Sequence, residues 1–146
     1  MPTPYATLAD LQIRYGVEID QVADRDGDGL ADPAVVDGVL ADVSAEIDSY
    51  LATRYTLPLA TVPLLLTRLA CAIARERLAL ASGMVLDPNQ AARIEADAAR
   101  KTLKALSDGT ALLGTQPEPA QQTAGTVQMT SGGRVWSRAA TGDDGL

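Results

Sequence analysis

Histidine and phenylalanine are absent from this sequence of 146 residues, and cysteine and tryptophan each occur once. Without histidine, the chain lacks the side chain that most often acts as a general acid or base near neutral pH. It also lacks the group that usually activates serine and cysteine nucleophiles, and the commonest side-chain ligand for zinc. We therefore expect a protein that is not an enzyme.

The single cysteine, Cys71, cannot form a disulfide within one chain. It lies in the apolar run "RLACAIA", which predicts a buried structural thiol rather than a reactive one. The cysteine count therefore gives no indication of an oxidising compartment.

Long hydrophobic segments are missing as well. The most apolar run, "ATVPLLLTRLACAIA", is interrupted by Pro63 and Arg68 and is too short to span a bilayer. The start, "MPTPYATLADLQ", has neither the basic nor the apolar region of a secretory signal. We expect a soluble protein that is made in the cytoplasm and contacts no membrane.

Aromatic residues make up only 3% of the chain, so the core has to be built from Leu, Val, Ile and Ala, which favours closely packed helices. Helix start and stop signals recur up to Gly109. They predict a mainly α fold, a small bundle of four to five helices. The predicted helical segments are 7–16, 17–23, 32–55, 64–82 and 91–109.

The segment 32–55 carries the clearest helical pattern. Apolar residues recur at alternating steps of four and three and form a seam that ends in an aromatic residue and a cation. The seam consists of Val36, Leu40, Val43, Ile47, Tyr50 and Arg54. Polar residues are predicted on the outer face, namely Asp37, Asp42, Ser44, Glu46 and Asp48.

From Thr110 onward the helical period stops, and Pro, Gly, Gln and Thr dominate. We predict a helical domain over 1–109, and a linker followed by an extended C-terminal arm over 110–146. The arm has short β-like pieces, "TVQM" and "RVWS", around a Ser-Gly-Gly turn. Its tryptophan either docks on a partner or packs on the chain's own helices. The candidate partner-binding residues are Val127, Met129, Arg134, Val135, Trp136 and Arg138.

Charge is unevenly distributed along the chain. Residues 1–50 contain 11 acids and 2 bases, a net charge of −9, whereas residues 51–109 contain 5 acids and 8 bases, a net charge of +3. These regions either neutralise each other within one chain or face each other between neighbouring chains of a ring. The net charge of −7 argues against duplex nucleic acid as a ligand. With no aromatic stacking partners beside them, the basic residues of 64–109 are predicted to form a solvated or interchain face.

The stretch "DRDGDGLAD" at 24–32 resembles the first part of an EF-hand loop. With Asp24 at loop position 1, Asp26, Asp28 and Asp32 occupy ligand positions 3, 5 and 9. Position 12, which normally carries a bidentate Glu, is Val35, so calcium affinity is expected to be weak, on the order of 10⁻⁴ M or worse. The alternative is a turn of Asp and Gly that precedes a helix capped by Asp32. No cofactor is required in either case.

Three segments carry a resemblance to a known family: "YATLADLQIRYG" at 5–16, "DRDGDGLADPAVVDGVLADVSAEIDSYLATRYTLPL" at 24–59, and "VPLLLTRLACAIARERL" at 62–78. Together they resemble the small head-to-tail connection proteins of Mu-like tailed phages and prophages. The segment "SGGRVWSR" at 131–138 resembles the short arm that often ends such proteins.

The resemblance implies a non-catalytic helical adaptor of the virion at the head–tail junction. Such adaptors sit as a ring, commonly of about twelve copies, between the portal and the next tail-proximal stopper or connector protein. DNA passes through the channel of the ring without specific binding. The resemblance does not assign a metal to the Asp-rich loop, so a calcium-binding helical module remains the alternative function.

Overall fold

In the computed structural model, residues 4–84 and 90–114 are described. This part of the chain forms five helices and no strand, which confirms the mainly α bundle. The helices are α1 (Leu8–Tyr15), α2 (Val17–Ala23), α3 (Pro33–Leu51), α4 (Leu64–Ala81) and α5 (Ala91–Asp108). None of the helices in the described ranges is long and apolar enough to cross a membrane.

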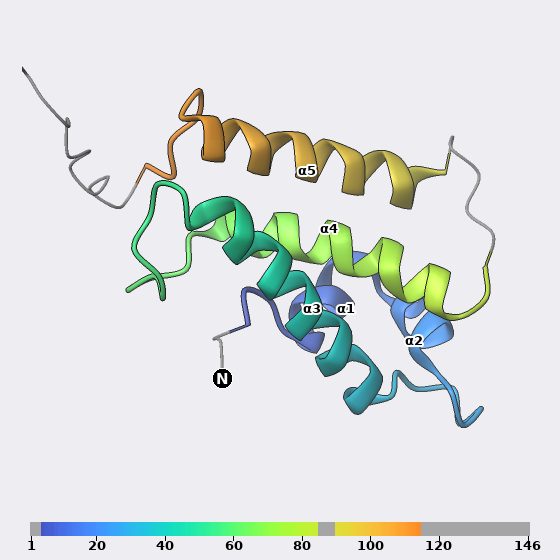
Figure 1. Ribbon diagram of the computed structural model, residues 1–146. Helices are drawn as coiled ribbons and strands as arrows, with labels where there is room; N and C mark the ends of the chain where they lie inside the picture. The colour runs from blue at the N-terminus through green and yellow to red at the C-terminus, as the bar shows by residue number, and fades with distance from the viewer. Residues whose placement is uncertain (1–3, 85–89, 115–146) are drawn as a thin grey trace, which may run out of the picture.

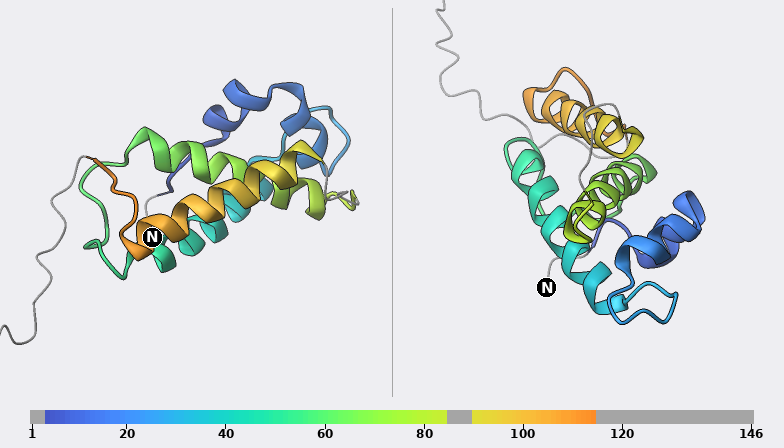
Figure 2. Two further views of the ribbon diagram at one scale, coloured as in Figure 1. Left: turned by 90° about the horizontal axis from the view of Figure 1, so that it is seen from above. Right: turned by 90° about the vertical axis from the view of Figure 1, so that its right-hand side faces the viewer.

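Helix α4 is the centre of the bundle. It contacts each of the other four helices, with α5 packed along one side and α3 along another, while α1 and α2 cover the remaining side (Figures 1 and 2). Ten of its residues are buried, among them Cys71, which confirms the predicted structural thiol. Burial raises the pKa of Cys71 to about 11, so the thiol stays protonated at neutral pH.

The ends of the first helices follow local sequence signals. Thr7 and Asp10 form a capping box, in which the Asp10 backbone N–H donates to the Thr7 hydroxyl (3.2 Å) and the Thr7 N–H donates to the Asp10 carboxylate (2.8 Å). The hydrogen bonds from Thr7 lower the pKa of Asp10. Gly16, at φ 55°, closes α1. Asp32 and Pro33 begin α3 as predicted, but the Asp32 side chain does not cap it.

The predicted seam of α3 is confirmed for Val36, Leu40, Val43 and Ile47, which are all buried. The helix ends at Leu51, earlier than the predicted segment, and Leu51 takes the next core position.

The prediction that Ser44 lies on the outer face is wrong, because Ser44 is only 1% exposed. Its hydroxyl donates to the Leu40 carbonyl (2.7 Å) and accepts from the Tyr5 N–H (3.3 Å). The Tyr5 hydroxyl donates to the Asp48 carboxylate, so the segment before α1 covers this side of α3. Ser44 is tolerated in the core because both of its hydrogen-bonding roles are satisfied.

Residues just beyond α5 stay on the bundle. Gly109, at φ 78°, ends the helix, and the N–H groups of Thr110 and Ala111 donate to the Ala105 carbonyl. Leu113 is buried, and its N–H donates to the Tyr55 hydroxyl (3.3 Å). The start of the predicted linker therefore contributes to the core. The rest of the arm, from residue 115, lies outside the described residues.

Candidate functional site

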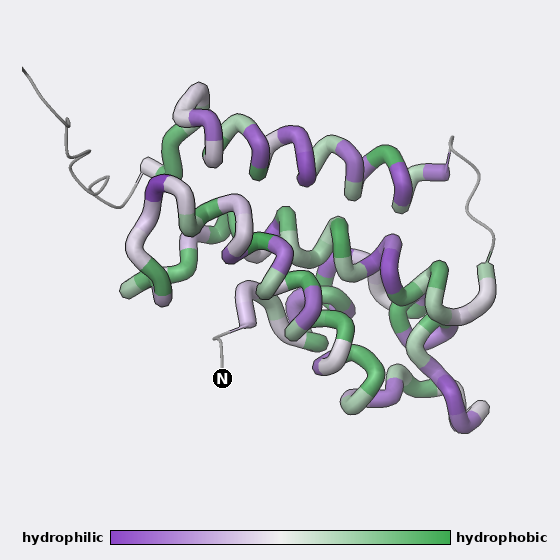
Figure 3. The backbone as a smooth tube through the Cα atoms, viewed as in Figure 1, coloured by the Kyte–Doolittle hydropathy of each residue, from purple (hydrophilic) through white to green (hydrophobic). Residues whose placement is uncertain are grey.

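Residues 24–32, the acidic loop, connect α2 to α3 at one end of the bundle (Figure 1, lower right). Hydrophilic residues gather there in Figure 3. The Asp24 carboxylate accepts the backbone N–H groups of Gly27 (2.6 Å) and Gly29 (2.9 Å). Both glycines have positive φ angles, 81° and 86°, which side chains with a Cβ rarely adopt. The two glycines thus let the chain wrap around one carboxylate.

The loop brings together three of the four predicted metal ligands. Carboxylate oxygens of Asp24, Asp26 and Asp28 lie within 4.8 Å of one another. Asp32 is used differently, since its carboxylate accepts the backbone N–H of Arg25 (2.9 Å). Val35 lies in the first turn of α3, where an EF-hand would place its closing Glu. The arrangement is a partial carboxylate cluster on a turn stabilised by its own hydrogen bonds.

The carboxylates of the loop differ in their pKa. The N–H groups of Gly29 and Gly27 lower the pKa of Asp24, because they stabilise its charged form. For Asp26, the N–H of Asp28 also lowers the pKa, but desolvation and the nearby carboxylates outweigh it, so the pKa is raised. The repulsion between like charges in the loop therefore contributes to the raised pKa of Asp26.

Arg25 anchors the acidic loop to the far end of α4. Its guanidinium donates to the Ala81 carbonyl (2.8 Å), at the C-terminal end of that helix, where a cation is favourable. The Asp32 N–H donates to the Ala23 carbonyl (3.1 Å) and closes the base of the loop. The loop is thus held at both ends.

Two ion-pair networks connect the helices. In the first, the Glu46 carboxylate of α3 binds Arg77 of α4 (2.6 Å) and Arg100 of α5 (3.0 Å). Arg100 also binds Glu76 (2.7 Å), whose side chain is only 7% exposed. Arg100 therefore offsets a charge that would otherwise be buried alone.

The second network is centred on Arg75 of α4. Its guanidinium binds Glu18 of α2 (2.8 Å) and Glu95 of α5 (3.2 Å), and lies 4.6 Å from the centre of the Tyr15 ring. The Tyr15 hydroxyl donates to Glu95 (3.2 Å). Burial, with Glu95 nearby, raises the pKa of Tyr15 to about 12.

The two networks show, for three arginines, whether the basic residues of 51–109 pair within the chain or face another chain. Arg75, Arg77 and Arg100 pair with acids of the same chain, so the predicted solvated or interchain face is wrong for these three residues. The intrachain alternative is confirmed for them. Arg14 and Arg68, in contrast, are exposed and have no ion pair within residues 4–84 and 90–114.

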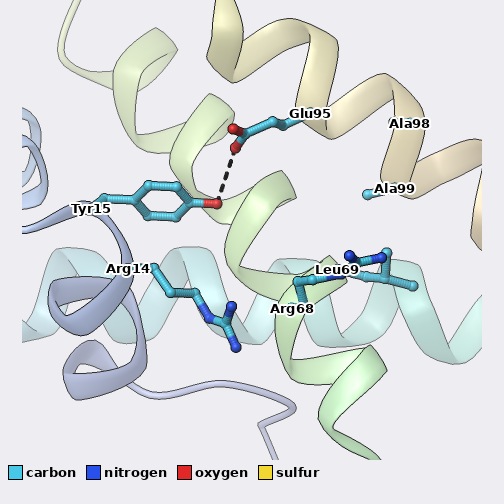
Figure 4. Close-up of a pocket in the computed structure, with 7 residues that line it drawn as sticks. All are labelled: Arg14, Tyr15, Arg68, Leu69, Glu95, Ala98 and Ala99. Carbon is cyan, nitrogen blue, oxygen red and sulfur yellow. Dashed lines mark hydrogen bonds between the residues drawn. The ribbon is translucent and has the colours of Figure 1, made fainter.

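Arg14 and Arg68 line a groove of about 450 Å³ that we call the arginine groove (Figure 4). It lies between α1, α4 and α5 and is bounded by Arg14, Tyr15, Arg68, Leu69, Glu95 and Ala98. In Figure 4 both guanidinium groups lie apart from Glu95, which accepts the Tyr15 hydroxyl. The groove thus combines two cations with an apolar wall, and its one carboxylate is already bound by Arg75.

The groove could not be predicted from the sequence, because its residues come from three separate helices. Two features of the sequence could have hinted at it. Arg68 is a cation within an otherwise apolar helical segment, and Ala98 lies in an alanine-rich segment that leaves room beside the helix. The candidate partner-binding residues of the arm lie outside the described residues. They are Val127, Met129, Arg134, Val135, Trp136 and Arg138.

Comparison with known proteins places the whole helical body in one family. The family model described as Bacteriophage Mu, Gp36 matches residues 5–131. "Gene product J" of Escherichia phage Mu is 47% identical over 72 residues, which are 48% of this chain and 51% of that protein. "Mu-like prophage FluMu protein gp36" of Haemophilus influenzae is 34% identical over 139 residues, 92% of this chain and 93% of that protein. This chain therefore belongs to the Bacteriophage Mu Gp36 family.

Proposed function

We propose that this chain is a structural protein of the phage particle that acts as an adaptor at the head–tail junction. Copies of it form a ring between the portal protein and the tail-proximal connector, and DNA passes through the ring. The observation that carries the proposal is the family match over residues 5–131, which includes all three segments that resemble head-to-tail connection proteins. Catalysis has no part in this role.

The distribution of charge suits a ring. Neighbours in a ring meet through two different surfaces of the same chain, so complementary surfaces on one copy favour the contact. The acidic loop and the arginine groove are two such surfaces, on different parts of the bundle. The excess of acidic residues, with a net charge of −7, would also keep DNA from adhering as it passes.

Antibody labelling of intact particles and separated heads, viewed by electron microscopy, tests this role. We expect label at the head–tail vertex only. Label at any other place, or no label in disrupted particles with exposed epitopes, would contradict it.

The C-terminal arm is proposed to anchor the adaptor, with Val127, Met129, Val135 and Trp136 as apolar contacts and Arg134 and Arg138 as polar ones. Deleting residues 120–146 should abolish joining of heads and tails while the helical body stays folded by circular dichroism. Normal infectious particles from this deletion would contradict the anchoring role.

Calcium binding is the second candidate function, favoured by the three clustered carboxylates of Asp24, Asp26 and Asp28. Calorimetry with millimolar calcium tests it, with Asp26→Asn as the disabling variant. The matched control is Asp37→Asn, an exposed carboxylate on α3 outside the cluster. Absence of heat and of any calcium-dependent thermal shift in the natural chain would exclude this function.

A further inference from the structure

We propose that the acidic loop of one copy docks into the arginine groove of the next copy, so that the ring is built by repetition of this single contact. The inference rests on the proposed ring and names the two surfaces that form it. It is motivated by two regions of opposite charge. Asp26 and Asp28 in the loop, and Arg14 and Arg68 in the groove, form no ion pair within the described ranges, although Asp10 lies within electrostatic range of Arg14.

The groove offers charge and apolar surface together. Arg14 and Arg68 are exposed cations, and their neighbour Glu95 is bound to Arg75 and Tyr15. Leu69 and Ala98 supply the apolar wall. A partner that brings carboxylates and one aliphatic side chain would satisfy both parts of this surface.

The acidic loop has this combination. Asp26 and Asp28 are exposed, and Leu30, two residues farther along, is 64% exposed although it is a large aliphatic side chain. Because the loop is already ordered by the hydrogen bonds to Asp24 and by Arg25, little conformational entropy would be lost on docking.

The loop and the groove of one chain cannot meet each other. Arg25 holds the loop at Ala81, at the end of α4, whereas Arg68 lies 13 residues earlier on the same helix. That spacing corresponds to about 20 Å along the helix axis. The contact therefore requires a second copy, and it joins two different surfaces, which is the kind of contact that forms rings.

Cysteine crosslinking of the full chain tests the contact, with Leu30→Cys in the loop and Ala98→Cys in the groove. Cys71 does not interfere, since it is fully buried, and the natural chain serves as the control. The double variant should give a ladder of disulfide-linked oligomers under mild oxidation, both at high protein concentration and in assembled particles. A mixture of the two single variants should stop at dimers. No interchain band in either preparation would overturn the contact.

Charge reversal adds a second readout. Arg14→Glu with Arg68→Glu should reduce the crosslinking yield at least tenfold, and adding Asp26→Arg with Asp28→Arg should restore it. Arg93→Glu, another exposed arginine without an ion pair in the described ranges, is the matched control and should leave the yield unchanged. Failure of the double reversal to restore crosslinking would overturn the pairing of these two surfaces.

The competing occupant of the groove is the segment around Asp143 and Asp144. If Thr141→Cys crosslinks to Ala98→Cys in place of Leu30→Cys, the loop is not the occupant and the proposal falls. The contact and the connector role fail separately. Antibody label at the vertex without crosslinking would support the connector role and contradict the contact between loop and groove. A ladder of crosslinked oligomers without label at the vertex would support the contact and contradict the connector role.

Discussion

Charge is used in two different ways in this molecule. Between the helices, Glu18, Glu46 and Glu76 are paired with arginines of α4 and α5 at 2.6–3.0 Å. Asp26 and Asp28 of the acidic loop are exposed, and so are Arg14 and Arg68 of the arginine groove. None of these four side chains has an ion pair within the described ranges. We call the paired glutamates and their arginine partners the closed group, because their charges are neutralised within the fold. We call Asp26, Asp28, Arg14 and Arg68 the open group, because their charges are available to a partner.

The comparison shows that the separation of charge along the sequence has two separate consequences. Part of the basic surplus of residues 51–109 neutralises acids of residues 1–50 inside the chain and fixes how α2 and α3 lie against α4 and α5. Arg68, in contrast, is exposed and has no ion pair within the described ranges. Substitutions in the closed group should therefore affect folding, and substitutions in the open group should affect assembly.

The largest effect on stability is expected from Arg100→Met. This change leaves Glu76 buried without its partner and removes one partner of Glu46, and it should lower the free energy of unfolding by about 2–3 kcal/mol. Urea denaturation measures the loss. Adding Glu76→Gln should recover part of it, because the uncompensated charge is then removed. A loss below about 0.5 kcal/mol, the range of an ordinary surface change, would contradict the closed network.

A smaller effect is expected at the glycine that ends α5. A Cβ at Gly109 would clash with the Arg54 guanidinium, and the φ of 78° disfavours any other residue. Gly109→Ala should destabilise the fold by about 1–2 kcal/mol. Gly38→Ala is the matched control, because its Cβ would meet nothing within 4 Å and the position is inside α3. Gly38→Ala should stabilise the fold by about 0.5–1 kcal/mol. Thermal unfolding of both variants should therefore show a lower melting temperature for Gly109→Ala and a higher one for Gly38→Ala.

Within the acidic loop, two carboxylates should respond to pH in opposite directions. The pKa of Asp24 is lower in the folded state, so its contribution to stability is present above its unfolded pKa of about 3.9 and is lost as pH falls through the folded value. The pKa of Asp26 is raised, so its contribution is present below the unfolded pKa and is lost as pH rises through the folded value.

At pH 7, Asp24→Asn should therefore lower the melting temperature slightly, and Asp26→Asn should raise it slightly. Both differences should disappear in strong acid, where all these carboxyls are protonated in the folded and unfolded states. Melting curves from pH 2 to pH 7 measure them. Equal shifts of the melting temperature, with the same sign for both variants at pH 7, would contradict this prediction. They would show that the hydrogen bonds to Asp24 do not stabilise its charged form relative to that of Asp26.

The smallest effect on folding is expected in the arginine groove. Arg14→Gln with Arg68→Gln removes two exposed charges that have no ion pair in the described part of the chain, together with a hydrogen bond from Arg14 to the Cys71 side chain. The free energy of unfolding should therefore fall by less than about 1 kcal/mol. The same variant should lose most of the crosslinking between Leu30→Cys and Ala98→Cys. Measuring the free energy of unfolding and the crosslinking yield in one preparation tests whether the open group acts in assembly and not in folding. A large loss of stability would contradict this separation of roles.

Local signals in the sequence predicted the helices well. The capping box of Thr7 and Asp10, the Asp32–Pro33 start and the stop at Gly109 each act within a few residues, so they can be recognised without knowledge of the rest of the fold. The apolar seam of α3 was predictable for the same reason. The sequence also identified the acidic loop, and three of its four candidate ligands do come together.

Contacts between distant segments were not predictable in this way. The helical pattern predicts Ser44 on the surface, where serine is usually found, but its N–H···O contact with Tyr5 comes from a residue 39 positions away. The arginine groove requires three helices to be placed next to one another, which helical periodicity alone cannot specify. The pairing of Glu46 with Arg77 and Arg100 depends on the same placement.

A cryo-electron microscopy reconstruction of the head–tail vertex, with this chain located in the density, would show directly how neighbouring copies meet. We expect a ring of copies in which each acidic loop lies in the neighbour's arginine groove, with Asp26 and Asp28 facing Arg14 and Arg68. A ring in which the loop and the groove are both exposed, or in which the groove holds another segment, would contradict it.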